Sequence, residues 1–172
     1  KQTVNIGSAF LQNEWKNQKW SILLGGRLDK HNLIDHVIFS PRANLRFNPS
    51  EDINLRLSYS SGFRAPQAFD EDLHIENVGG TVSMIERAKN LKEEKSQSFS
   101  ASADMYHRFG AFQVNFLVEG FYTRLSDVFV LENIGERDGI LIKERRNGSG
   151  AKVLGLSMEG KMAYLSLFQL QA

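Results

Sequence analysis

Arginines at even spacings on two neighbouring predicted strands are the first candidates for binding chemistry. Arg42 and Arg46 lie on one strand, and Arg56 and Arg64 on the next. Alternate residues of a strand point to the same side, so these guanidinium groups share a face. Guanidinium groups bind carboxylates in bidentate fashion, and we predict pairing with acids such as Asp104 and Glu119. The alternative is that the row attracts an anionic ligand.

A second candidate is the acidic part of the long stretch 65–94. Stretches of this length without strand pattern are often functional, so we predict ligand contact there, against the alternative of a solvated loop. The residues are Phe69, Asp70, Glu71, Asp72 and His74. A dedicated Ca²⁺ site needs about six oxygen ligands, so these adjacent acids do not predict a metal site.

Enzyme chemistry is not indicated by any motif in the chain. There is no G-x-S-x-G elbow and no H-E-x-x-H pair, and the four histidines are scattered. The glycines of Asn147-Gly148-Ser149-Gly150 lack the lysine and following helix of a phosphate loop. We therefore expect a protein that is not an enzyme and holds no cofactor.

Alternation of apolar and polar residues predicts the elements that carry these groups. In 53–64, Leu55, Leu57 and Tyr59 fall on one face, and Arg56 and Ser58 on the other. The pattern recurs, predicting an all-β antiparallel meander of about seven to eight strands. We expect strands at 3–13, 19–28, 37–48, 53–64, 95–108, from 112 onward and at 152–163, a hairpin within 128–146, and an eighth strand beginning after 164. The phase of the pattern is lost at 124–127.

The first strand is expected to place Val4, Ile6 and Phe10 on one side. Turns near Asn17, Ser50, Gly110 and Tyr164 are short, whereas the intervening connections are longer. Aromatic residues flank the short turns: Trp15, Trp20, Phe47, Phe109, Phe112 and Tyr164. Such asymmetry and such rings at the lipid–water boundary are typical of transmembrane β-barrels. A soluble β-sandwich or lipocalin-like barrel is the alternative.

Bulk composition narrows the function classes further. The 172 residues carry a net charge of +1, which gives no support to nucleic-acid binding. Cysteine is absent, and no apolar run reaches the roughly 18 residues of a transmembrane helix. The chain has neither an initiating Met nor a signal peptide, so we expect an internal fragment.

Four motifs together resemble one family. They are Ser40-Pro41-Arg42 opening a strand, Gly62-Phe63-Arg64-Ala65-Pro66 closing the next, Asn90-Leu91-Lys92 before a third, and Asn147-Gly148 with Gly155 and Glu159. The chain resembles the C-terminal barrel of TonB-dependent outer-membrane receptors, in a Bacteroidota-like form. Glu93 stands where that family usually has Pro. In this family Arg64 is expected to brace the junction between strand and loop.

The resemblance implies that residues 1–172 are part of a transmembrane β-barrel of about 22 strands in a Gram-negative outer membrane, with the plug domain and the remaining barrel absent. Residues 65–94 would be an extracellular loop, and the arginine row would face the lumen and plug. The implied function is import of a ferric siderophore, haem, cobalamin or glycan with TonB-coupled energy. Implied partners are the TonB complex through the plug, outer-membrane lipid and a surface lipoprotein. The rival interpretations are a small structural, adhesin-type or lipid-binding barrel, and a truncated piece with no activity of its own.

Overall fold

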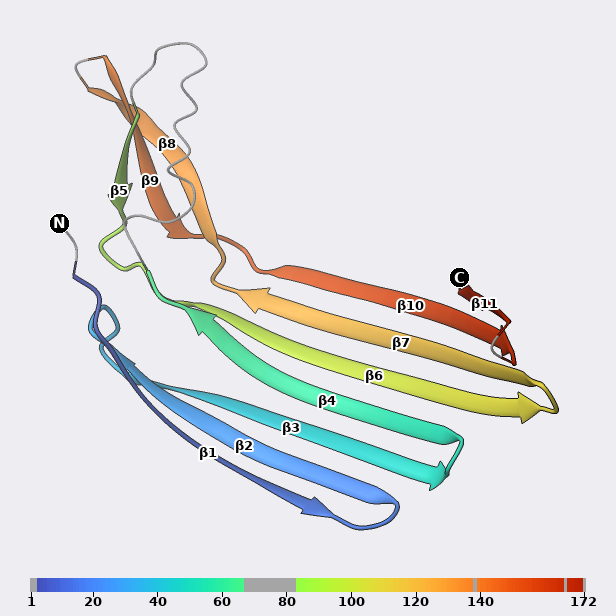
Figure 1. Cartoon of the computed structure of the whole chain (residues 1–172). Coiled ribbons are helices and arrows are strands. Elements are labelled where there is room, and N and C mark those ends of the chain that lie inside the picture. Colours follow the sequence, from blue (N-terminus) through green and yellow to red (C-terminus); the bar gives the residue numbers. More distant parts are fainter. Residues whose placement is uncertain (1–2, 67–82, 138, 166, 172) are drawn as a thin grey trace.

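The computed structural model describes residues 3–66, 83–137, 139–165 and 167–171, and most of them form one curved antiparallel sheet (Figure 1). Its eight strands lie in the order β1-β2-β3-β4-β6-β7-β10-β11, which confirms the predicted meander. The strands of this sheet are β1 (Ile6–Lys16), β2 (Trp20–His31), β3 (Val37–Ser50), β4 (Ile53–Arg64), β6 (Glu94–Phe109), β7 (Phe112–Ser126), β10 (Ala151–Tyr164) and β11 (Phe168–Gln171). No helix in the described part of the chain is long and apolar enough to cross a membrane.

The pairing register sorts the side chains onto two faces. Across β3, β4 and β6, Leu45, Leu57 and Ala101 lie opposite one another and define the apolar face. One residue further along each strand, Arg46, Arg56 and Ser102 define the polar face. This sorting follows from the two-residue period of a strand, and it confirms the alternation read from the sequence.

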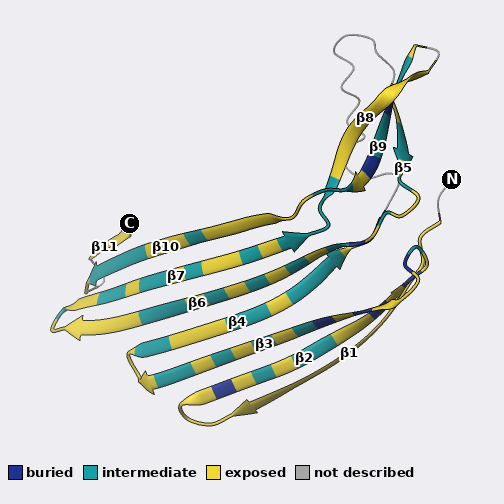
Figure 2. Cartoon of the chain, turned by 180° about the vertical axis from the view of Figure 1, so that it is seen from behind, coloured by how far each residue is buried: buried dark blue, intermediate teal, exposed yellow. Residues whose placement is uncertain are grey.

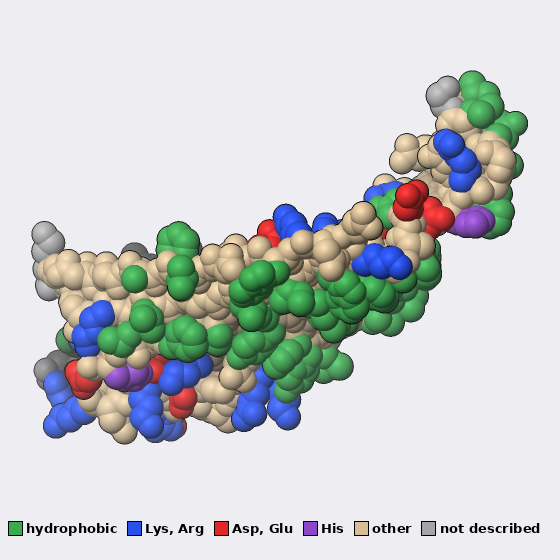
Figure 3. Space-filling view, turned by 90° about the horizontal axis from the view of Figure 1, so that it is seen from below, with side chains coloured by type: hydrophobic (Ala, Val, Ile, Leu, Met, Phe, Trp, Pro, Cys, Tyr) green, Lys and Arg blue, Asp and Glu red, His purple; other side chains and the backbone are tan. Residues whose placement is uncertain are grey.

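The apolar face is not sealed inside a core. Leu57 is 55% exposed and Leu156 is 66% exposed. Figure 3 shows hydrophobic side chains gathered in a broad band along the strands, with charged side chains at its margins. Among the described residues, the buried hydrophobic cluster consists of Ile34, Ile38 and Ala65, with Phe63 packed against it. The arrangement is opposite to that of a soluble sandwich, in which the apolar faces pack together.

Two belts of aromatic rings bound the apolar face. At the short-turn end Trp20 stacks on Phe47 with ring centres 4.0 Å apart. At the loop end Tyr59 and Phe99 lie 4.7 Å apart, and Tyr122 is the next residue of the same cross-strand row. Along β7, the roughly ten residues from Phe112 to Tyr122 span about 34 Å, or about 24 Å of vertical height at a tilt near 45°. This height matches the apolar band of about 25 Å in membrane barrels.

In the first strand Ile6 and Phe10 share one side, as predicted, and the register shows which face of the sheet that is. Ile6 lies opposite His31 and Phe10 opposite Arg27, so both side chains are on the polar face rather than the apolar one. Asn17 sets this register, because its side-chain oxygen accepts hydrogen bonds from the backbone N–H groups of Lys19 (2.9 Å) and Trp20 (2.7 Å). Hydrophobic residues occur on both sides of β1, so the turn decides the pairing. Figure 2 shows β1 exposed along its length.

A second, three-stranded sheet extends from the loop end of the first (Figure 1). It consists of β5 (Ser83–Arg87), β9 (Ile140–Asn147) and β8 (Phe129–Arg137). The β8–β9 hairpin confirms the one predicted within 128–146. The strand β5 was not predicted: the stretch 65–94 contains a strand that pairs in parallel with β9. Asp127, with φ of 55°, ends β7 where the sequence pattern loses phase.

Candidate functional site

The polar face brings the predicted arginines onto neighbouring strands. Arg46 on β3 lies directly opposite Arg56 on β4, and Arg42 lies opposite Ser60. The side chains of Arg42, Arg46 and Arg56 are exposed. Opposed like charges repel each other, so this part of the face carries a positive potential that an anion would relieve.

The two predicted acidic partners share this face but are engaged differently. Asp104 accepts hydrogen bonds from Asn115 Nδ2 (2.5 Å) and Tyr106 Oη (3.0 Å). Glu119 lies opposite Ser102, which lies opposite Arg56, so two strand spacings of about 10 Å in total separate the charged residues. In the described part of the chain, no ion pair joins either acid to Arg42, Arg46 or Arg56.

Arg64 occupies the junction between β4 and the following segment. Its Nη2 lies 3.7 Å from Oε2 of Glu94, and its guanidinium carbon lies 5.0 Å from the centre of the Phe129 ring. The same Glu94 oxygen accepts a hydrogen bond of 3.1 Å from the backbone N–H of Phe129. Arg64 therefore links the loop ends of β4 and β6 to the start of β8, a geometry that fits the bracing role expected of it.

Glu93 was not among the predicted site residues, and it forms a charged cluster at the loop end. Its side chain is 6% exposed, and its Oε1 lies 3.0 Å from both His36 Nε2 and Lys95 Nζ. The cluster joins the β2–β3 connection to the start of β6. Burial alone raises the pKa of Glu93, but the hydrogen bonds from Lys95 and from the backbone, with the charges of Lys95 and His36, lower the pKa below its usual range. The sequence contained one sign of this cluster: Glu93 stands where the family usually has Pro.

This cluster should lose stability at low pH. Because folding lowers the pKa of Glu93, its stabilisation is complete above the ordinary Glu pKa of about 4.3 and disappears as the pH falls through the folded value. The protection of the amides of residues 32–36 against hydrogen exchange, taken relative to their intrinsic rates, should therefore decrease in acid. Glu93→Gln should show the low protection already at neutral pH. Equal exchange in both proteins at pH 7 would contradict a role for the carboxylate.

The predicted loop residues Phe69, Asp70, Glu71, Asp72 and His74 lie outside the described residues. Among the residues that are described, no group of three His, Asp or Glu side chains is arranged to hold a metal ion. Ligand contact by the acidic stretch stays a prediction.

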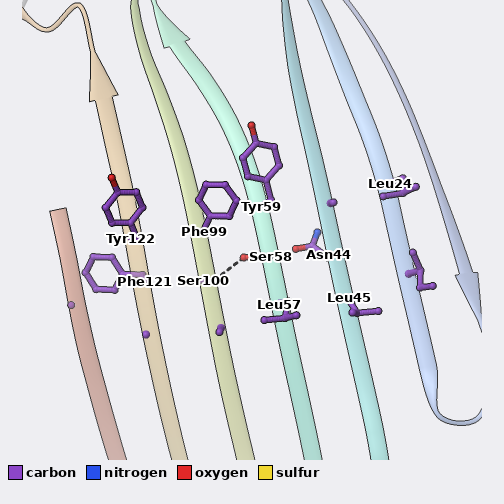
Figure 4. A pocket seen from close by; sticks show the side chains of 15 residues that line it. Leu24, Asn44, Leu45, Leu57, Ser58, Tyr59, Phe99, Ser100, Phe121 and Tyr122 are labelled. Atoms are coloured by element: carbon purple, nitrogen blue, oxygen red, sulfur yellow. Dashed lines mark hydrogen bonds between the residues drawn. The ribbon is translucent and has the colours of Figure 1, made fainter. Parts of the chain in front are cut away.

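An open depression of about 790 Å³ lies along the middle of the sheet (Figure 4). Its lining is mainly apolar and includes Leu24, Leu45, Leu57, Tyr59, Phe99 and Tyr122. The rings of Tyr59, Phe99 and Tyr122 stand on three adjacent strands of the apolar face. The hydrogen bond of 2.7 Å between the hydroxyl groups of Ser58 and Ser100 lies on the opposite, polar face. Such a surface offers contact area to an apolar molecule.

The comparisons with known proteins agree with this architecture. The family model described as "TonB dependent receptor-like, beta-barrel" matches residues 1–171. The chain belongs to the TonB-dependent receptor β-barrel family. The resemblance read from the four sequence motifs is thereby confirmed, while a Bacteroidota-like origin stays a prediction. No curated protein matched this receptor barrel chain.

Solved structures of other receptors share the fold of this TonB-dependent receptor barrel. The siderophore receptor PirA from Pseudomonas aeruginosa superposes with a TM-score of 0.77 at 17% identity, covering 98% of this chain and 35% of that one. The ferric enterobactin receptor PfeA from the same organism, as the R480A mutant, gives 0.67 at 16% identity, with coverages of 92% and 24%. The FrpB iron transporter from Neisseria meningitidis (F5-1 variant) gives 0.69 at 15%, with coverages of 93% and 24%. The chain spans about a third or less of the length of these receptors.

Proposed function

We propose that this chain forms part of the wall of an outer-membrane transporter, with its apolar face against lipid and its polar face toward the lumen. The exposed apolar face between two aromatic belts carries the proposal, because its height of about 24 Å suits a bilayer. In this placement the short turns lie on the periplasmic side, and the sheet β5-β9-β8 extends outside the cell.

The proposed cargo is a ferric siderophore, taken up with energy delivered by TonB through a plug domain. Two observations support this class: the first favours it over haem, cobalamin and glycans, and the second suits any anionic iron complex, including haem with its two propionates. The structural neighbours are named as siderophore receptors and an iron transporter. Arg42, Arg46 and Arg56 give the polar face a positive potential that would favour an anionic iron complex.

In this mechanism the protein changes no covalent bond of its cargo. Arginines on the lumen wall lower the electrostatic energy of an anionic ligand that has left the extracellular loops. They also suit the carboxylates of a plug, which would occupy the same face in the resting state. When the plug is displaced, the anionic ligand would replace the plug carboxylates as the partner of these arginines.

A growth assay tests the cargo class. The full-length gene is deleted, and growth is measured on ferric siderophores, haem, cobalamin and glycans supplied separately. The expected result is loss of growth on a ferric siderophore with unchanged growth on the other sources. Loss of growth on haem, cobalamin or a glycan instead would contradict the proposed cargo.

The double variant R42Q/R56Q should slow uptake of an anionic iron complex. Electrostatic focusing in a cleft changes association rates by about 10- to 1,000-fold. Since two of the three cations Arg42, Arg46 and Arg56 are lost, we expect the uptake rate to decrease by about tenfold. Uptake of ⁵⁵Fe-labelled siderophore is measured at equal surface expression. K89Q/K92Q is the matched control, since it removes two exposed cations outside the polar face. Equal uptake by the two variants would rule out the electrostatic role.

A further inference from the structure

Cations gather on the apolar face at its loop end, where lipid-facing surfaces are otherwise uncharged. Arg124 on β7 lies directly opposite Lys152 on β10. Lys95 on β6 lies on the same face, since its neighbour two residues along, Gln97, is opposite Arg124. All three side chains are exposed. They follow immediately after the aromatic belt of Phe99 and Tyr122, so they stand just beyond the apolar band.

The positive charges of Arg124 and Lys152 are not compensated by the residues that the structure describes. Like charges directly opposite each other on a sheet are destabilising. Lys95 is neutralised by Glu93, with a distance of 3.0 Å between Nζ and Oε1. No acidic residue in the described segments forms an ion pair with Arg124 or Lys152.

The apolar depression adjoins this pair on the same face. Tyr122, which lines the depression, is two residues from Arg124 and lies opposite Leu154, which is two residues from Lys152. The small residues Ala43, Ala101 and Gly120 also line it, and the register places them on the apolar face between larger side chains. The two cations therefore stand at the end of an apolar depression with a volume of about 790 Å³.

We propose that Arg124 and Lys152 bind the phosphate group of an outer-leaflet lipid whose acyl chains lie along this depression. The assignment rests on the proposed placement of the apolar face against the membrane. Arginine binds phosphate oxygens in bidentate fashion, and lysine adds a compact positive charge. A zwitterionic lipid brings its own ammonium group and so leaves the net positive charge of the pair uncompensated, and free phosphate would leave the depression empty.

Native mass spectrometry of the full-length receptor in detergent tests this site. The probes are bis-phosphorylated lipid A, phosphatidylethanolamine and inorganic phosphate, each titrated separately. Each cation near an anionic lipid surface contributes about 1 kcal/mol, so R124Q/K152Q should weaken lipid A binding by about 30-fold. K89Q/K92Q should bind as the unmodified receptor does, and the charge-retaining R124K/K152R should preserve most of the affinity.

Three results would overturn the proposal. They are equal lipid A binding by R124Q/K152Q and K89Q/K92Q, equal binding of phosphatidylethanolamine and lipid A, and displacement of lipid A by millimolar inorganic phosphate. A detergent-resistant gel shift confirms that each variant is folded. If the lipid-binding test fails, the proposal of siderophore uptake still stands. The proposed function itself would be refuted by a receptor that is soluble without detergent and transports no iron.

Discussion

Replacing Leu57 with Arg is expected to lower the free energy of unfolding of the receptor in lipid vesicles by about 2–4 kcal/mol. Leu57 lies near the middle of the apolar face, between Leu45 and Ala101, and is 55% exposed. In the proposed placement its side chain contacts acyl chains, and a guanidinium group there would lose its hydration. Denaturant unfolding from phospholipid vesicles measures the change.

The neighbouring residue supplies the control. Ser58 points to the polar face, where its hydroxyl bonds that of Ser100 at 2.7 Å. Ser58→Arg removes this hydrogen bond and places the charge toward the proposed lumen, so a loss of about 1 kcal/mol is expected. Similar costs at the two positions would show that the apolar face does not meet lipid.

Gly150→Ala is expected to destabilise the barrel by about 1–3 kcal/mol through a backbone clash. Gly150 lies between β9 and β10, and a Cβ there would overlap the carbonyl oxygen of Leu125 on β7. Backbone atoms paired in a ladder cannot move aside as a flexible side chain can. The same unfolding measurement detects the loss, together with faster hydrogen exchange at the loop end of β7.

Gly160 in β10 is the matched position for this test. A Cβ at Gly160 would meet no atom within 4 Å. Gly160→Ala should therefore leave stability unchanged or raise it by about 0.5 kcal/mol, because alanine restricts the unfolded chain. A comparable loss at Gly160 would mean that the clash is not the cause at Gly150.

Strands and faces could be predicted from the sequence where alternation is strong. The bounds of β4 match the predicted strand at both ends, and the faces of β3, β6 and β10 follow their apolar residues. These strands have one apolar and one polar side, so a shift of one residue would place every side chain on the wrong face. The β1 strand lacks this contrast, and local hydrogen bonds of Asn17 determined its pairing instead.

The loop end could not be predicted in the same way. The β5 strand has only five residues, and its partner β9 lies more than 50 residues further along the sequence. No local sequence pattern therefore predicts this pairing. The Glu93 cluster likewise depends on bringing His36 close to Lys95. Strand periodicity alone is enough to predict that the arginines share one face. Their ion-pair partners could not be predicted, because these depend on side-chain conformations and on distances between strands.

The parallel pairing of β5 with β9 ties two separate connections of the meander together. One connection leaves β4 and returns at β6, and the other leaves β7 and returns at β10. Register pairs from Ser83–Leu141 to Arg87–Arg145 join them, so neither can swing outward alone without breaking backbone hydrogen bonds. We therefore expect that force applied to the paired segments is shared by the four strands β4, β6, β7 and β10 that they connect.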